Sequence, residues 1–139
     1  MKSYSLCILV VVFTLLACAC GKKWPGGISS GYPAGDNDPW LTVQAGSAEP
    51  VVKAVQRYET LRGHYPKEEA DLITFMSSTP ASREGILGGW HYVKDGMGFR
   101  LNLSLGWDPS LIYVGSKSSA HWAFDPGDGT PEKVIILTP

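Results

Sequence analysis

Cysteine is absent from most of this sequence. All 3 cysteines of the 139-residue chain lie near its start, at Cys7, Cys18 and Cys20. A domain built from the residues after Cys20 can therefore hold no disulfide, no thiolate zinc site and no cysteine nucleophile. Such a domain must be stabilised by packing and hydrogen bonds alone.

The sequence also has no excess of charge of one sign. Its 12 lysines and arginines stand against 13 aspartates and glutamates, which gives a formal net charge of −1. A chain without a basic excess has no general attraction for polyanions, so we expect no nucleic-acid partner. With 44% hydrophobic residues, 16 glycines and 10 prolines, the composition is typical of one turn-rich globular domain.

No apolar run is long enough for a permanent membrane span. The longest run extends only from Leu6 to Ala17, whereas a spanning helix needs roughly 20 residues. Lys2 precedes the run, and the polar segment Gly21-Lys22-Lys23 follows it. A positively charged start before a short apolar run is typical of a signal peptide. We therefore predict that residues 1–17 are a signal peptide.

The end of the apolar run carries a recognisable junction. Leu15-Leu16-Ala17-Cys18 resembles the lipobox of bacterial lipoproteins, in which an aliphatic, a variable and a small residue precede a cysteine. The resemblance implies that Cys18 becomes the first mature residue and carries lipid, with acyl chains such as palmitate. Cys20 is the alternative lipidated residue, although Ala17 is then a poorer upstream residue. An ordinary secretory signal cleaved near Ala19, or an uncleaved short anchor, is the remaining alternative.

The residues after the junction predict a tether and then a domain. No acidic residue follows Cys18 or Cys20 closely, so the lipobox resemblance implies an anchor in the outer membrane, with the folded part facing the periplasm. Residues 18–46 are predicted to be a Gly/Pro/Ser-rich tether, because they show neither helical nor strand periodicity. Within it, only Trp40 to Val43 is expected to fold back. The domain is predicted to cover residues 47–139.

An apolar stripe at helical spacing predicts the main helix of the domain. The stripe consists of Val51, Ala54, Val55, Tyr58 and Leu61. Ser47 is expected to cap the start of this helix and Gly63 to end it. Pro66 is expected to open a second, short helix, which Thr79-Pro80 ends.

Beyond Gly85 the apolar residues alternate with a period of two. The clearest strand alternates Phe99, Leu101, Leu103 and Leu105 with polar residues. Other strands are predicted at Trp90 to Tyr92, Leu111 to Val114, His121 to Phe124 and Val134 to Leu137. Short links between short strands favour antiparallel pairing. We expect an α+β fold, with one main N-terminal helix packed on an antiparallel sheet of about four to five strands.

Part of the domain resembles the C-terminal head of type II secretion pseudopilins. In that family a helix with a tyrosine is followed by Gly-x-Tyr-Pro and a Leu-rich helical turn, matched here by Tyr58, Gly63-His64-Tyr65-Pro66 and Leu72. The hairpin with Trp90-His91-Tyr92 and Gly98-Phe99-Arg100-Leu101 is also similar to the family's sheet. The resemblance implies a pseudopilin-like head and an association with secretion or pilus machinery.

The same resemblance excludes one function of the family. Pseudopilins have a Gly-Phe-Thr-Leu-x-Glu processing site followed by a long apolar helix that packs subunits into a filament. Here Val12-Phe13-Thr14-Leu15-Leu16 lacks the glycine, the glutamate and the long helix. Polymerisation by that route is therefore not expected.

Residues that could carry chemistry are few and scattered. The 3 histidines are His64, His91 and His121, and no two have the spacing of metal ligands on one element. Asp125-Pro126-Gly127-Asp128-Gly129 resembles the late calcium loop of major pseudopilins, so Asp125 and Asp128 are weak calcium candidates. Two carboxylates supply fewer oxygens than calcium prefers, and a plain turn is favoured. We expect no cofactor and no catalytic residues.

The sequence favours a noncatalytic envelope lipoprotein that acts as a binding or assembly component. One alternative is a periplasmic enzyme acting on cell-wall or carbohydrate substrates, which requires His91, His121 and an acidic residue to meet in one cleft. Another is a carbohydrate-binding module, which requires the loop tryptophans Trp24, Trp40 and Trp107 to line an exposed groove.

Overall fold

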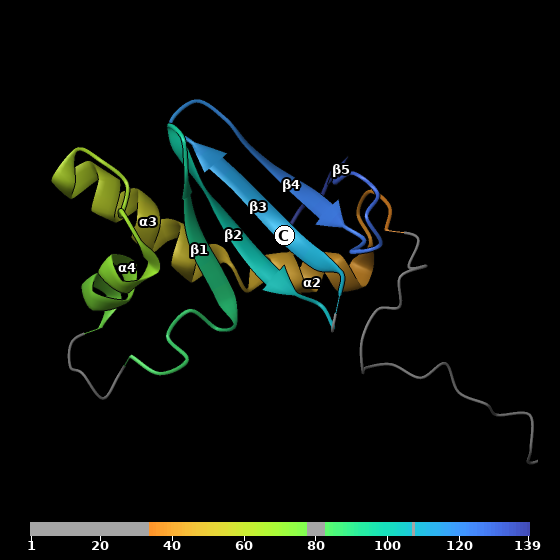
Figure 1. Cartoon of the computed structure of the whole chain (residues 1–139), viewed down its shortest axis with the longest axis horizontal. Coiled ribbons are helices and arrows are strands. Elements are labelled where there is room, and N and C mark those ends of the chain that lie inside the picture. Colours follow the sequence, from red (N-terminus) through yellow and green to blue (C-terminus); the bar gives the residue numbers. More distant parts are fainter. Residues whose placement is uncertain (1–33, 78–82, 107) are drawn as a thin grey trace, which may run out of the picture.

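Residues 34–77, 83–106 and 108–139 are described by a computed structural model, in which helices pack against an antiparallel sheet (Figure 1). The helices are α2 (Pro39–Gly46), α3 (Glu49–Arg62) and α4 (Glu69–Met76). The strands are β1 (Trp90–Asp95), β2 (Gly98–Ser104), β3 (Ser110–Ser116), β4 (Ala120–Asp125) and β5 (Lys133–Ile135). They pair in chain order, and each pairing is antiparallel. The expected α+β fold is confirmed.

Aromatic side chains dominate the inner face of the sheet. Tyr92, Leu101, Tyr113 and Trp122 are consecutive cross-strand partners from β1 to β4. The ring centroids of Tyr113 and Trp122 are 5.0 Å apart, and those of Phe99 and Tyr113 are 5.9 Å apart. Phe99 and Leu101 are buried, as the alternation in the sequence predicts. The core therefore lies between this face and the helices.

The β1–β2 turn explains how two strands reverse so tightly. Asp95 pairs with Gly98, which leaves Gly96 and Met97 as the two central residues. Gly96 has a φ of 52°, a conformation that a side chain would strain. A glycine with positive φ at the first central position matches the twist of the flanking strands. The predicted hairpin is confirmed.

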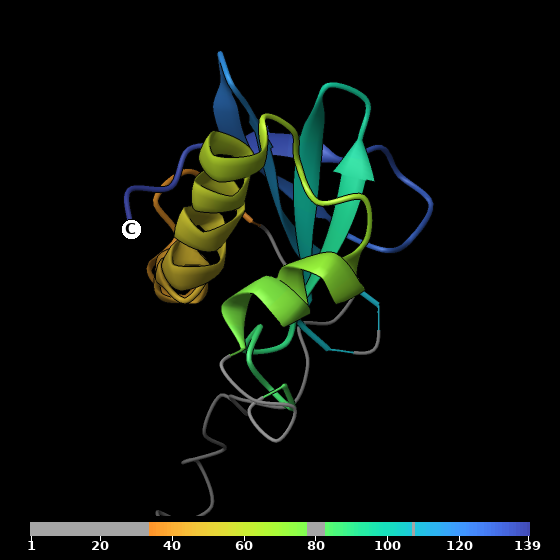
Figure 2. The same ribbon diagram turned by 90° about the vertical axis from the view of Figure 1, so that its left-hand side faces the viewer.

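Helices α2 and α3 follow one another along the same side of the sheet (Figure 2). Val51 and Val55 of α3 are buried, as the predicted apolar stripe requires. Leu61, predicted to be the last member of that stripe, is 62% exposed. The last turns of α3 extend past the sheet in Figure 1, so they have no strand to cover.

Helix α2 replaces the last part of the predicted tether, and within it Trp40 and Leu41 fold back onto the domain as expected. Leu41 and Ala45 have exposed fractions of 0% and 2%, so the helix belongs to the core. Asp38 caps its start, because the Asp38 carboxylate accepts hydrogen bonds from the N–H groups of Trp40 and Leu41, each at 3.0 Å. The folded domain therefore begins before residue 47, and residues 39–46 are not an extended linker. Cys18, Cys20, the predicted signal peptide and the tether up to residue 33 lie outside the described residues.

The helix starts also differ from their predicted positions. Ser47 ends α2 instead of capping α3, whose N-cap residue is Ala48. α4 begins at Glu69 and not at Pro66. Pro66 is held by β1, because the hydroxyl of Tyr92 donates to its carbonyl at 2.7 Å. Within the described ranges, the helices lack the combination of length and apolar character that crossing a bilayer requires.

Candidate functional site

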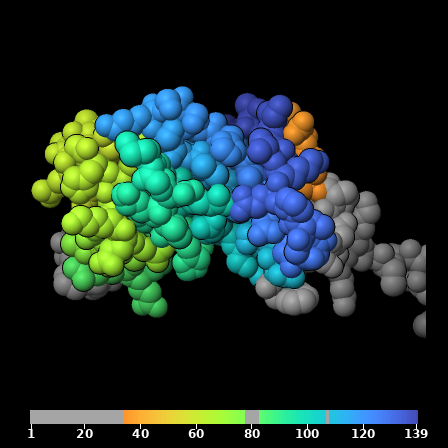
Figure 3. Space-filling model, turned by 45° about the horizontal axis from the view of Figure 1, so that its top comes forward, coloured from red at the N-terminus to blue at the C-terminus, as the bar shows by residue number. Residues whose placement is uncertain are grey.

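A surface pocket lies where two hairpin turns approach the end of α3. It has a volume of about 420 Å³ and is called the hairpin pocket below. It is lined by Glu59 and residues 63–65 of the α3 end, by Lys94, Gly96 and Met97 of the β1–β2 hairpin, and by residues 116–118 of the β3–β4 turn. In Figure 3 these yellow-green, green-cyan and blue segments gather at one end, away from the orange residues at the start of the described chain. Three segments far apart in the sequence therefore build one site.

The α3 end shapes one wall of the hairpin pocket. Gly63 has a φ of 77° and donates its N–H to the carbonyl of Glu59, which ends the helix. The Nδ1–H of His64 donates to the carbonyl of Tyr65 at 2.9 Å. Tyr65 then turns into the core, where its ring centroid is 5.3 Å from that of Phe99. Burial raises the pKa of the Tyr65 hydroxyl, which is therefore a neutral group in this wall.

The charged groups of the hairpin pocket are mainly cationic. Lys117 pairs with Glu59 at 2.5 Å, and the hydrogen bond to that carboxylate raises the pKa of the lysine. The Nζ of Lys94 donates to the Gly96 carbonyl at 3.0 Å and forms no ion pair with the described residues. Asp95 is the next residue of β1, and its side chain leaves the opposite face of the sheet because strand side chains alternate. Within the described part of the chain, Lys94 is thus the one charge in this lining without an opposite charge.

The exposed thioether of Met97 forms an apolar part of the rim. Met97 is 91% exposed at the tip of the β1–β2 turn. The facing β3–β4 turn is polar, and the Ser116 hydroxyl accepts from the N–H groups of Ser118 and Ser119 at 3.3 and 3.1 Å. These bonds fix the turn that carries Lys117. The pocket therefore combines an apolar side chain, ordered polar turns and an unbalanced ammonium group.

His91 and His121 do not meet in a cleft. His91 of β1 is opposite Asn102, which is opposite Ile112 of β3, whereas the β3 partner of His121 is Val114. Three strand spacings therefore separate the two histidines, or about 14 Å. His91 Nδ1 lies 3.6 Å from the Glu69 carboxylate, and both side chains are accessible to solvent. The geometry that the enzyme alternative requires is absent from the described residues.

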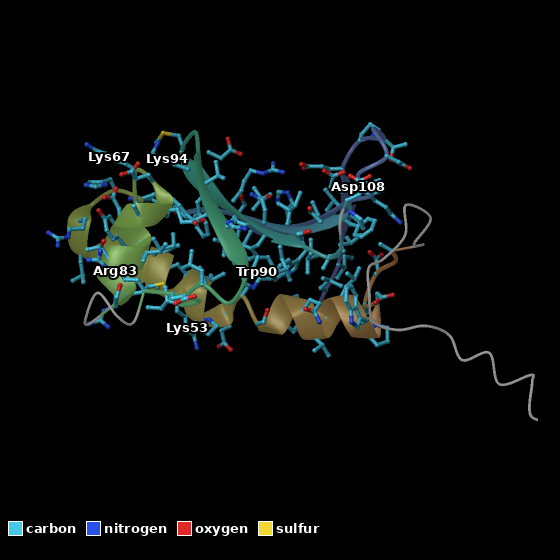
Figure 4. The ribbon with its side chains drawn as sticks, turned by 60° about the horizontal axis from the view of Figure 1, so that its bottom comes forward. Lys53, Lys67, Arg83, Trp90, Lys94 and Asp108 are labelled. Carbon is cyan, nitrogen blue, oxygen red and sulfur yellow. The ribbon has the colours of Figure 1, made fainter. Side chains whose placement is uncertain are left out.

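The two calcium candidates stabilise turns of their own loop. Asp125 accepts a hydrogen bond from the N–H of Gly127 at 2.8 Å. Asp128 accepts from the N–H and the hydroxyl of Thr130 at 3.0 and 2.6 Å, and these bonds lower the pKa of its carboxyl group. The structure describes no group of three or more His, Cys, Asp or Glu side chains placed to hold a metal. Asp108 lies next to Gly127 of this loop, and Figure 4 shows it far from Lys94 and Lys67.

The loop tryptophans do not form a described groove. Trp40 is half-buried and packs against the core. Trp24 and Trp107 lie outside the described residues. A second hollow of about 470 Å³ lies between α3 and α4, lined in part by Lys53, Arg57 and Phe75.

Comparisons with known proteins found no relative of this chain. No family model, no curated protein and no solved structure matches the chain. The class that fold and site define is an α+β domain with a cationic, partly apolar pocket between two hairpin turns and a helix end. Sequence reasoning missed Lys94, Met97 and Lys117, although Asp95–Gly98 and Gly115–Ser118 already had the composition of turns.

Proposed function

We propose that this chain is a noncatalytic binding or assembly component of a bacterial cell envelope. In this proposal a lipid on Cys18, or alternatively on Cys20, anchors it to the outer membrane, and the domain faces the periplasm. Its partners belong to type II secretion or pilus-like machinery. The support for anchoring is the Leu15-Leu16-Ala17-Cys18 junction, and the support for binding is the hairpin pocket.

The position of the hairpin pocket carries the proposal. The described chain begins at residue 34 next to β5, because the Nζ of Lys133 donates to the Ala34 carbonyl at 3.1 Å. The hairpin turns and the α3 end lie at the other end of the domain (Figure 1). A tether attached before residue 34 would therefore hold the pocket away from the membrane. That orientation is suited to contact with a partner in the periplasm.

Mass spectrometry tests the anchor. The N-terminal peptide of the mature protein is expected to begin at Cys18 and to carry the mass of acyl chains. Cys18→Ser should abolish the modification, whereas Cys20→Ser should leave it intact. A chain that retains residues 1–17 and carries an unmodified Cys18 would contradict the proposed anchor.

Site-specific photo-crosslinking in the native envelope tests the binding role. A photoreactive residue at Met97 is expected to capture secretion-system subunits. The matched control is Val43, which is 69% exposed on α2 and distant from the hairpin pocket. Capture of the same proteins from both positions, or of no secretion subunit from Met97, would overturn the proposed role.

A further inference from the structure

The hairpin pocket has a composition that restricts its ligand. Its volume of about 420 Å³ is that of a small-ligand or short-peptide site. Among the described residues, the Lys94 ammonium has only the Gly96 carbonyl as a partner, while Lys117 is neutralised by Glu59. Because only one charge remains unbalanced, the best complement is a ligand with a single negative charge.

The ammonium of Lys94 is oriented toward the pocket by the strand itself. Trp90 and Tyr92 are buried on the helix side of β1, and Lys94 follows them with the same parity. Its cross-strand partner is Phe99, whose ring belongs to the core. Lys94 itself is exposed to solvent, so its ammonium is accessible to a ligand at the edge of this apolar surface and can form a charge-assisted hydrogen bond there.

Met97 adds an apolar contact close to that charge. Met97 directly follows Gly96, whose carbonyl binds Lys94, and both residues belong to the β1–β2 turn. A thioether is flexible and polarizable, so it can pack against different aliphatic or aromatic groups. A ligand that fits both features has an apolar group next to an anion.

We infer that the hairpin pocket binds the C-terminal end of a partner polypeptide whose last side chain is apolar. A chain terminus has one carboxylate, which would accept hydrogen bonds from Lys94, and an adjacent side chain, which would contact Met97. An internal acidic segment would bring several carboxylates to a site with one unbalanced cation and would place one of them near Glu59. This ligand class rests on the proposed binding role and specifies its chemistry.

Fluorescence anisotropy with the full chain in detergent tests this inference. The probes are fluorescein-labelled Gly-Ser-Gly-Ala-Phe as the free acid and the same peptide as the carboxamide. The free acid is expected to bind about tenfold more tightly, because only it offers a charged acceptor to Lys94. Lys94→Ala should remove this difference without changing the binding of the amide.

Two matched variants separate local from general effects. Lys53→Ala removes an equal charge from an exposed position of α3 outside the hairpin pocket, so the preference for the free acid should persist. Met97→Ser should weaken both peptides, whereas Val134→Ser, at a position that is 64% exposed on β5, should weaken neither. Circular dichroism checks that each variant is folded.

The results that would overturn the inference are distinct from those that would overturn the binding role. Equal affinity for acid and amide, or a preference that survives Lys94→Ala, excludes recognition of a chain terminus. Saturable binding of sodium decanoate with no binding of either peptide would indicate a fatty-acid ligand and would also exclude it. If Met97 still crosslinks to secretion subunits in these cases, only the ligand class fails. If it does not, the proposed function fails as well.

Discussion

The hydroxyl of Ser47, at the junction of α2 and α3, links the helices to the sheet. It donates to the carbonyl of Gln44 at 2.6 Å and accepts from the indole Nε1–H of Trp90 at 3.0 Å. Trp90 is only 1% exposed, so its N–H has no access to bulk water. One small side chain therefore fixes the α2–α3 junction over the start of β1.

Replacing Ser47 tests this role. Ser47→Ala leaves the buried Trp90 N–H without an acceptor, and we expect a loss of about 1–3 kcal/mol in the free energy of unfolding. Ser47→Thr retains the hydroxyl and should lose less. Thr60→Ala is the control, because the Thr60 hydroxyl bonds to the Gln56 carbonyl on an exposed face. Urea denaturation measures all three; an equal loss for Ser47→Ala and Thr60→Ala would contradict the role.

Gly115 provides space for the aromatic core. A Cβ at this position would lie 2.7 Å from Cζ of Phe99 and 2.8 Å from Cε1 of Tyr113. Gly115→Ala is therefore expected to destabilise the domain by about 1–3 kcal/mol through overpacking. Gly35→Ala is the matched control, because a Cβ there meets nothing within 4 Å. An equal shift of the thermal unfolding midpoint for both variants would contradict this, because it would show that the Phe99 and Tyr113 rings move aside without cost.

Tyr92 makes the stability of the domain depend on pH in the alkaline range. Burial raises the pKa of its hydroxyl above the ordinary value of 10.0, and the neutral hydroxyl donates to the Pro66 carbonyl. The contribution of the neutral form is complete below about pH 10 and is lost as pH rises toward the folded-state pKa. The free energy of unfolding should fall in that range by at most about 1.4 kcal/mol per pH unit for this proton. Tyr92→Phe should fall less steeply; identical slopes in urea titrations would contradict this.

At the scale of elements, α2 shows the limit of sequence periodicity. The helix has 8 residues, and its buried positions are only Leu41 and Ala45, one turn apart. Two apolar positions within two turns do not produce a stripe, and Pro39 and Gly46 at its ends resemble linker composition. Asp38 before Pro39 was the available signal, since Asp is a favourable N-cap and Pro a favourable first helical residue.

The placement of α2 predicts a large effect at Leu41, in the part of the tether that the sequence expects to fold back. Leu41→Ala should destabilise the domain by about 2–5 kcal/mol, because it removes a fully buried side chain. Val43→Ala is the control on the same helix, at a position that is 69% exposed, and should change stability by less than about 0.5 kcal/mol. Similar midpoints of chemical denaturation for the two variants would mean that α2 is not part of the core.

The strands were easier to predict than the helix ends. Phe99 and Leu101 alternate with Arg100 and Asn102, and this pattern alone defines both the strand and its buried face. The segments before helices also make contacts distant in sequence, such as the bond from the Tyr92 hydroxyl to the carbonyl of Pro66, the residue at which the sequence predicts the second helix to open. No local pattern in the sequence contains that contact.

At the scale of the whole molecule, the order of the strands follows from the short links, whereas the hairpin pocket does not. Neighbouring strands joined by a few residues pair with each other, which gives the order β1 to β5. The pocket depends on how far α3 extends along the sheet and on where two separate turns end. Lys94 and Lys117 are 23 positions apart in the chain, so their proximity to one hollow could be seen only in the folded structure.

The whole domain is expected to be insensitive to thiol reagents. No cysteine follows Cys20, so no disulfide can constrain the residues from 34 onward. The thermal unfolding midpoint should therefore be the same with and without dithiothreitol. A fall in the midpoint under reducing conditions would show that the cysteines near the start contribute to the stability of the fold.

The first and last described segments lie against each other. The N–H of Ile136 donates to the Asp36 carboxylate at 2.9 Å across 100 positions of chain, and the Asn37 N–H donates to the Ile136 carbonyl at 2.7 Å. Completing the fold therefore requires two segments that are about 100 positions apart in the sequence. During synthesis the segment around Asp36 therefore has no stable partner until the residues around Ile136 are available, so the fold can be completed only late in synthesis of this domain.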